Sequence, residues 1–347
     1  MNRTGRGIAV VVVCLLLGGA LYVGLTARKM VQVDSGYKVV MGTFSRAVAI
    51  APSEKVARAC IAAAFEEQRR VEELMSYHNC DSELNTVNRE AHQRAVEVDE
   101  ATFEVLEKAR QFSELSGGAF DVTIGALGEL WRRAAAADTV PTEAEIAEAK
   151  SRVGYDKLLL DTNTRTVRFA AEGMRIDLGG IAKGYAVDKS VAAMKKRGAA
   201  GGMVDLGGNI RCFGRPPEGQ ECWRVGLQDP NVAPDELGGS KLLLVLTLTD
   251  ESVATSGDYR RFVKVQGSKE SHIIDTGTGK GAHKLVSDTI IASNAVTADA
   301  LSTAVNVLGP EAGLALVESI PDVEAILIPV GRDAQPIFSS GAKAYVR

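Results

Sequence analysis

Cysteines are few in this sequence, and no two of them are closely spaced. Five occur in 347 residues, and there is no Cys-x-x-Cys pair, which argues against a zinc ribbon and against a thioredoxin-type redox site. Cys212 and Cys222 flank the segment FGRPPEGQE (213–221). A disulfide between them would close this turn, and two independent small core residues explain the spacing equally well.

Long basic runs and the common nucleotide-binding fingerprints are also missing. The chain has 40 Lys and Arg against 44 Asp and Glu, a formal net charge of −4, and no basic run long enough to follow a nucleic acid. It contains neither G-x-G-x-x-G nor G-x-x-x-x-G-K-[ST], so Rossmann-type and P-loop binding are not indicated. No nucleic-acid partner is therefore expected.

Aromatic residues are scarce at 5%, but hydrophobic residues make up 46% of the chain. That fraction is enough for the core of one large domain or of two modest ones. The 35 glycines are clustered rather than periodic, which excludes a collagen-like repeat and favours tight turns beside a ligand.

One long uncharged stretch lies near the N-terminus, at residues 7–27. At about 1.5 Å per residue, a helix of this length spans the ~30 Å hydrocarbon core of a bilayer. We predict a signal anchor over 1–29 with a transmembrane helix at about 7–27. A cleaved signal peptide is the alternative, because Gly18-x-Ala20 is an acceptable cleavage site. Both interpretations place residues 30–347 outside the cytoplasm.

The remaining sequence alternates between strand and helix patterns. We predict helices that begin after Ser53, Asp99 and Thr142, one between the two glycine turns described below, and one that ends at Gly309. The strands expected from the same patterns lie at 43–51, 157–170 (a hairpin), 174–178, 240–250, 259–266, 271–276, 285–293 and 325–330. Several strands are consecutive and no linker is visible, which favours a single composite α+β domain.

The unit Asp-Leu-Gly-Gly occurs twice, at 177–180 and at 205–208. The first is predicted to join a strand to a helix, a geometry that directs backbone N–H groups at a phosphate. Lys183, one turn into that helix, is placed to reach a phosphate or to pair with Asp177. Taken alone, the first unit is explained better by an ordinary strand-to-helix turn than by a phosphate site.

Four further motifs carry candidate polar groups. SGGAFDVTIGAL (116–127) places a phenylalanine beside an aspartate, VATSGDYRR (253–261) is predicted as a polar turn before a strand, and SHIIDTGTG (271–279) places a histidine on a strand. TADALST (297–303) places Asp299 and Thr303 four residues apart on one helix. Residues at that spacing share a face, and their two oxygens suit a hard cation such as Mg2+.

Together and in this order, the motifs resemble the FAD:protein FMN transferase family (ApbE family), from MGTFSRAV at residue 41 to about Gly309. The resemblance implies an enzyme that binds FAD and a divalent metal, Mg2+, on the periplasmic side of the inner membrane. It moves FMN from FAD onto a Thr or Ser hydroxyl of a membrane redox-complex subunit and releases AMP.

The resemblance also implies roles for individual residues. Gly180, through its carbonyl oxygen, and the side chains of Asp299 and Thr303 correspond to metal ligands. Residues that correspond to FAD contacts are Met41, Tyr77, Ala119, Phe120, Asp121, Asp177, Lys183 and Ile273.

Two candidates for the general base remain, and the chain departs from the family pattern at one position. His272 is the first candidate base, because histidine titrates near neutral pH, and Asp258 is the second. Thr276 stands where the family usually has a proline, which we expect to loosen the turn.

Two other functions stay open: hydrolysis of FAD to FMN and AMP, and non-catalytic flavin binding. The chain lacks the Asp-x-x-[Ser/Thr]-Gly-Ala-Thr pattern of flavinylated acceptors. It therefore resembles the modifying enzyme and not the modified protein.

Overall fold

The computed structural model describes residues 30–347, apart from 231, 233–240, 258–261 and 332–333. A nine-stranded sheet with antiparallel pairing throughout forms its centre, in the order β1-β3-β7-β8-β11-β14-β15-β16, with β2 paired to β3. The strands of this sheet are β1 (Val31–Asp34), β2 (Lys38–Val40), β3 (Thr43–Ala51), β7 (Gly201–Leu206), β8 (Asn209–Gly214), β11 (Ser252–Gly257), β14 (Leu285–Ala292), β15 (Glu324–Pro329) and β16 (Ile337–Phe338).

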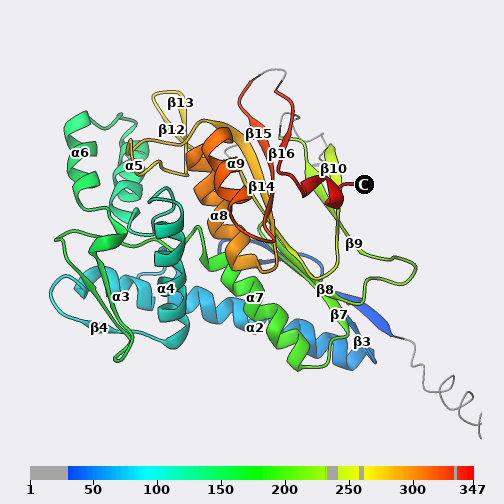
Figure 1. Ribbon diagram of the computed structural model, residues 1–347. Helices are drawn as coiled ribbons and strands as arrows, with labels where there is room; N and C mark the ends of the chain where they lie inside the picture. The colour runs from blue at the N-terminus through cyan, green and yellow to red at the C-terminus, as the bar shows by residue number, and fades with distance from the viewer. Residues whose placement is uncertain (1–29, 231, 233–240, 258–261, 332–333) are drawn as a thin grey trace, which may run out of the picture.

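Four helices pack on one face of the sheet and a two-stranded ribbon packs on the other (Figure 1). The helices are α2 (Glu54–Met75), α7 (Ala182–Lys196), α8 (Ala295–Leu308) and α9 (Pro310–Glu318), and the ribbon is β9 (Trp223–Gln228) with β10 (Leu242–Leu248). The central strands of the sheet are therefore covered on both faces.

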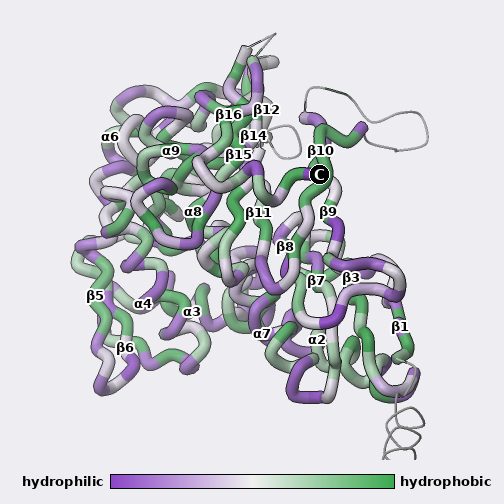
Figure 2. Tube along the Cα trace, turned by 45° about the vertical axis from the view of Figure 1, so that its right-hand side comes forward, coloured by the Kyte–Doolittle hydropathy of each residue, from purple (hydrophilic) through white to green (hydrophobic). Residues whose placement is uncertain are grey.

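Strand β3 shows how its sequence builds this sandwich. Alternate residues of a strand point to opposite faces. Ala47, Ala49 and Ala51 join the core on the helical side, while Val48 and Ile50 join the core beneath the ribbon. Small side chains let α2 approach closely, and larger ones fill the gap to β9 and β10. Figure 2 shows hydrophobic segments concentrated along the strands and hydrophilic segments at the outer turns.

A smaller group of elements lies beside the sheet, at the left of Figure 1. Its cores contain Leu84, Phe103, Leu130 and Ile146. The elements are α3 (Glu83–Glu90), β4 (Val96–Glu97), α4 (Glu100–Leu115), α5 (Gly125–Ala137), α6 (Glu143–Ser151), η1 (Tyr155–Lys157), β5 (Leu158–Asp161), β6 (Thr166–Phe169), β12 (Phe262–Val265) and β13 (Ser268–Ser271), while η2 (Ala342–Tyr345) closes the chain next to β10.

The structure confirms the mixed α+β class and most of the helix starts. Ser53 and Asp99 accept hydrogen bonds from the first turns of α2 and α4, and Thr142 forms a reciprocal capping box with Glu145 at α6. The predicted strand at 43–51 is β3 without change.

Three local predictions are wrong. Residues 174–178 form no strand beyond a bridge between Arg175 and Ile124, because single hydrogen bonds to the Asn88 side chain and to the backbone of Val122 and Gly125 hold the segment in place of a neighbouring strand. Residues 253–257, predicted as a turn, belong to β11, which pairs on both sides with β8 and β14. Strand β13 ends at Ser271, so His272 does not lie on a strand.

Neither a membrane-spanning helix nor a disulfide is found in the described part of the chain. No helix there combines the length and apolarity needed to cross a bilayer, and the predicted span at 7–27 and the rest of 1–29 lie outside the described residues. Cys212 and Cys222 are both free thiols. Cys212 is buried under the ribbon, and this burial raises the pKa of its thiol.

Candidate active site

The first Asp-Leu-Gly-Gly turn is held in place at its N-terminal end. The Ile176 N–H donates to Oδ1 of Asn88 at 2.7 Å, and the Asn88 amide donates back to the Ile176 carbonyl at 3.0 Å. Next along the chain, the Asp177 N–H donates to the carbonyl of Val122 at 2.7 Å, and Oδ1 of Asp177 accepts the Gly179 N–H at 2.9 Å. The sequence offered no signal for Asn88, which lies 88 residues before its partner.

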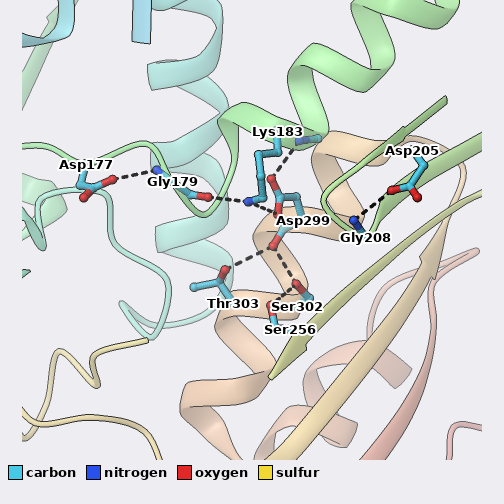
Figure 3. A network of polar contacts seen from close by, with 10 residues as sticks. Asp177, Gly179, Lys183, Asp205, Gly208, Ser256, Asp299, Ser302 and Thr303 are labelled. Atoms are coloured by element: carbon cyan, nitrogen blue, oxygen red, sulfur yellow. Dashed lines mark hydrogen bonds and ion pairs between the residues drawn. The ribbon is translucent and has the colours of Figure 1, made fainter. Parts of the chain in front are cut away.

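Asp299 is the centre of the polar network shown in Figure 3. Its side chain is buried, with the residue 4% exposed. Oδ2 accepts the Gly184 N–H at 2.9 Å, and Oδ1 lies 3.3 Å from Nζ of Lys183, which also donates to the Gly179 carbonyl at 2.7 Å. Lys183 therefore forms its ion pair with Asp299. The predicted alternative, an ion pair between Lys183 and Asp177, is wrong.

Gly180 lies where a side chain would not fit. A Cβ built on it would lie 2.9 Å from Oγ1 of Thr303 and 3.3 Å from the Phe120 ring. The missing side chain thus lets the turn approach α8 and Phe120 closely. The structure brings Gly180 and Thr303 together on the side of α8 that carries Asp299, and Phe120 lies against Gly180.

Helices α7 and α8 contact each other closely at two positions of α7, Gly184 and Asp188. A Cβ on Gly184 would lie 2.2 Å from the Ala295 carbonyl oxygen, so only glycine permits this crossing. One turn further along α7, the Asp188 carboxylate accepts the N–H groups of Ala295 and Val296, each at 2.9 Å, and pairs with Arg211. Asp188 thereby accepts the first two N–H groups of α8, the helix that carries Asp299, while Asn294 is its N-cap residue. The sequence alone did not indicate this role for Asp188, although the residue lies in the helix predicted between the two glycine turns.

Helix α8 is also tied to the sheet below it. Oγ of Ser302 lies 2.8 Å from Oγ of Ser256 and donates to the Asp299 carbonyl at 3.1 Å (Figure 3). One turn later, the Asn306 amide donates to the buried Asp288 at 2.9 Å. The ATSG part of the VATSGDYRR motif thus supports the helix that carries Asp299.

The GGAFD segment supplies one apolar and one acidic side chain. Phe120 is buried and meets Phe112 edge to face, with ring centroids 6.3 Å apart. Asp121 is also buried, and Oδ1 accepts the Thr123 N–H at 2.8 Å and the Thr123 hydroxyl at 2.7 Å. Burial raises the pKa of Asp121, while these hydrogen bonds act in the opposite direction.

Thr276, the departure from the family pattern, lies against the same segment. Its hydroxyl donates to the carbonyl of Gly118 at 2.8 Å. This position is therefore held by a side-chain hydrogen bond, where a looser turn was expected. Thr276, Gly118 and Asp121 line a cavity of about 220 Å³ together with the η1 turn.

Met41 and Tyr77 pack against the large core that contains Phe120. Met41 occupies the turn between β2 and β3 with φ +52, a conformation that is uncommon for a residue with a side chain and is enriched at functional sites. The Arg132 guanidinium lies 4.2 Å from the centroid of the Tyr77 ring, a stacking contact that the sequence did not reveal.

Four predicted site residues remain: Ile273, Ala119, His272 and Asp258. Ile273 is buried with Ala282 and Val307, and Ala119 packs against this group, so these two predicted flavin contacts lie together. His272 is exposed in the segment that follows β13. Asp258, the second candidate base, lies outside the described residues.

The second Asp-Leu-Gly-Gly unit forms a different structure from the first. It is the two-residue turn of the β7–β8 hairpin, with φ +63 at Gly207 and +91 at Gly208, and Oδ1 of Asp205 accepts the Gly208 N–H at 3.0 Å. The same four residues thus precede a helix in one place and form a hairpin turn in the other. The first unit is followed by α7, whereas the second is followed by β8, which pairs back onto β7.

The chain is similar to known proteins over most of its length. A sequence profile of the ApbE family matches residues 41–327. An FAD:protein FMN transferase of Treponema pallidum is 36% identical over 333 residues, covering 92% of this chain and 90% of that protein. The crystal structure of the ApbE protein from Thermotoga maritima superposes with a TM-score of 0.79 at 32% identity, covering 92% of this chain and 100% of that one. The flavin transferase ApbE from Vibrio cholerae gives a TM-score of 0.77 at 28% identity, covering 91% and 100%. The chain belongs to the ApbE family.

Proposed function

We propose that this protein transfers FMN from FAD to a Ser or Thr hydroxyl of an acceptor protein and releases AMP. The observation that carries the proposal is the meeting of the glycine turn at Gly180 with Asp299 and Thr303 on α8. The relatives named FAD:protein FMN transferase support the same reaction.

The residues around Asp299 fit a hard divalent cation. They offer a buried carboxylate, the Thr303 hydroxyl and the backbone carbonyl of Gly180, which are all oxygen donors. No group of three His, Cys, Asp or Glu side chains suited to a metal occurs in the described ranges, so a complete protein cage is not present there. Mg2+ commonly binds through one or two carboxylates plus substrate phosphates, and when bound it would act as a Lewis acid toward the diphosphate.

The chain's own groups orient the substrate. Lys183 brings a positive charge to the glycine turn, where it can attract a diphosphate, and the turn lets the backbone approach closely. Phe120, which packs beside Gly180, and Ile273, which lies in the same cluster as Ala119, are the proposed apolar contacts of the flavin ring. Met41, Tyr77, Ala119, Asp121 and Asp177 complete the proposed FAD contacts.

The transfer step needs a base for the attacking hydroxyl. The hydroxyl oxygen of the acceptor bonds to the phosphorus of the FMN portion, the bond from that phosphorus to the oxygen of AMP breaks, and the hydroxyl proton passes to the base. We assign the base to His272, with Asp258 as the alternative, because a histidine can accept a proton near neutral pH.

Location completes the proposal. The uncharged stretch at 7–27 is proposed to anchor the protein in the inner membrane, with residues 30–347 in the periplasm. This arrangement would place the site beside acceptor subunits of membrane redox complexes.

The test is the fate of FAD with and without an acceptor. The full chain in detergent is given FAD, Mg2+ and a carrier protein fused to a peptide with the pattern Asp-x-x-Thr-Gly-Ala-Thr. We expect AMP and covalently flavinylated carrier in equal amounts. Equal release of AMP and FMN without labelled carrier would indicate a hydrolase, and FAD binding without AMP would indicate a flavin carrier.

A further inference from the structure

Two oxygen acceptors hold the ammonium of Lys183 beside the glycine turn. Nζ lies 3.3 Å from Oδ1 of Asp299 and 2.7 Å from the Gly179 carbonyl oxygen, and Figure 3 shows the side chain reaching from α7 toward both. Among the described residues, Lys183 supplies the one ion pair of Asp299. Asp299 is also the one carboxylate among the three proposed metal ligands. The lysine and the proposed metal therefore share a single carboxylate.

The Asp299 carboxylate is held in place by the backbone of α7. Oδ2 accepts the Gly184 N–H at 2.9 Å, and a Cβ built on Gly184 would lie 2.8 Å from Cβ of Asp299. The Asp299 side chain is only 5% exposed. A carboxylate that is buried, closely packed and hydrogen-bonded in this way has little room to turn away from α7.

Lys183 is the more mobile partner of the pair. Its side chain is 22% exposed, and a lysine carries its ammonium on a flexible four-carbon stem with three rotatable donors. Its second acceptor, the Gly179 carbonyl, belongs to the glycine turn that we propose to face the diphosphate of FAD. When another cation approaches Oδ1 of Asp299, the lysine is therefore the group that can move.

The charges at this carboxylate make its two cations competitors. A divalent metal and an ammonium at one carboxylate repel each other, and a buried site screens that repulsion poorly. The diphosphate of FAD brings negative charge to the glycine turn, where Lys183 can pair with a phosphate oxygen in place of Asp299. The metal and FAD should therefore bind cooperatively, with Lys183 as the residue that couples them.

We propose that Lys183 competes with divalent metal for Asp299 and keeps the metal from binding tightly until its ammonium pairs with the diphosphate of FAD. The inference rests on the proposed function, because it assigns an order of binding to the same site. It goes beyond a phosphate contact, since it gives Lys183 opposite effects on the two ligands: the lysine weakens the binding of metal and strengthens the binding of FAD.

The first test measures metal binding without FAD, so it requires no turnover. Mn2+ is titrated into the full chain in detergent, and free Mn2+ is measured by electron paramagnetic resonance. In Lys183→Met the Kd for Mn2+ should fall by about tenfold or more, because the competing charge is gone. Lys183→Gln, which can keep a hydrogen bond to the Gly179 carbonyl, should behave in the same way. Lys183→Arg keeps the charge and should keep the parental Kd.

A matched control and a second measurement accompany this titration. Lys195→Met removes a positive charge from the same helix, where the partner Asp250 is exposed and 3.9 Å away, and should leave the Kd for Mn2+ unchanged. Flavin fluorescence then gives the Kd for FAD in EDTA and in Mg2+. Mg2+ should lower that Kd by a larger factor in the parent than in Lys183→Met, because the coupling between two ligands is reciprocal.

A gain in metal affinity separates competition from a structural role, because a lysine that only supports the fold would lower the affinity when it is replaced. A Kd for Mn2+ in Lys183→Met and Lys183→Gln at or above the parental value would overturn the inference, and so would equal tightening in Lys183→Arg. If Asp299→Asn binds Mn2+ as tightly as the parent, the proposed metal site itself fails, which is a different result.

Discussion

The ammonium of Lys183 lies 3.3 Å from Oδ1 of Asp299, across the contact between α7 and α8. The carboxylate is almost fully buried, and its second oxygen accepts the Gly184 N–H. Lys183 thus balances the buried charge of Asp299, and its hydrogen bond to the Gly179 carbonyl joins it to the glycine turn. One lysine therefore links the turn to the helix that carries the proposed metal ligands.

Replacing Lys183 with methionine should destabilise the fold. The variant leaves the Asp299 charge buried with one backbone donor, so the free energy of unfolding should fall by about 1–3 kcal/mol. Urea denaturation without added metal measures this. Lys195→Met on the same helix is the control, because its ion pair with Asp250 is exposed and long at 3.9 Å and should contribute less than about 1 kcal/mol. Equal effects of the two variants would contradict the pairing.

Thr276→Val should weaken FAD binding. The change removes the hydroxyl that donates to the Gly118 carbonyl and keeps the side-chain shape. The GGAFD segment therefore loses one of the hydrogen bonds that hold it in position. A hydrogen bond of this kind contributes about 1 kcal/mol, or roughly a fivefold rise in the Kd for FAD. Fluorescence titration measures it, and Thr278→Val in the same turn serves as the control. Parental affinity in Thr276→Val would show that the bond does not support the flavin site.

Asp121 should make stability fall as pH rises. Burial raises the pKa of this carboxyl in the native state, so the native state keeps its proton to a higher pH than the unfolded chain, where the pKa is about 3.9. The unfolding free energy therefore decreases as pH rises from about 3.9 to the native pKa, by about 1.4 kcal/mol for each unit between them. Urea unfolding from pH 4 to 7 should show this decrease in the parent and a flatter profile in Asp121→Asn. Parallel profiles would contradict the assignment.

The full chain should fractionate with membranes and be accessible to protease from outside the cytoplasm. The reason is the uncharged stretch at 7–27, which is long enough to span a bilayer. Cell fractionation and protease treatment of spheroplasts measure both properties. A soluble periplasmic form that begins near Leu21 would replace the anchor with a cleaved signal peptide.

The sequence predicted the parts of the fold that depend on local chemistry. Ser53, Asp99 and Thr142 cap helices because their side chains bond to the next turn, and Asp299 and Thr303 share a face because of helical periodicity. These features need no information about distant residues.

Other features depend on partners far away in the chain and were missed. The segment at 174–178 resembles a strand, but Asn88 and Val122 hold it, and no local pattern indicates a partner 88 residues earlier. The role of Asp188 depends on the N-terminus of α8, more than 100 residues later. The second Asp-Leu-Gly-Gly unit differs from the first because β8 pairs back onto β7 after it.

The rate of FMN transfer by Asp299→Ala tests the account most directly. The variant removes the one carboxylate among the three proposed metal ligands, so transfer to the acceptor carrier at fixed Mg2+ should fall at least ~100-fold, a loss of several kcal/mol in transition-state stabilisation. FAD binding should weaken much less, Thr303→Ala should be milder because it removes a neutral ligand, and Asp299→Asn, which keeps the side-chain shape, should fold normally and still transfer poorly. Transfer by Asp299→Ala at near the parental rate would contradict the metal site and the roles assigned around it.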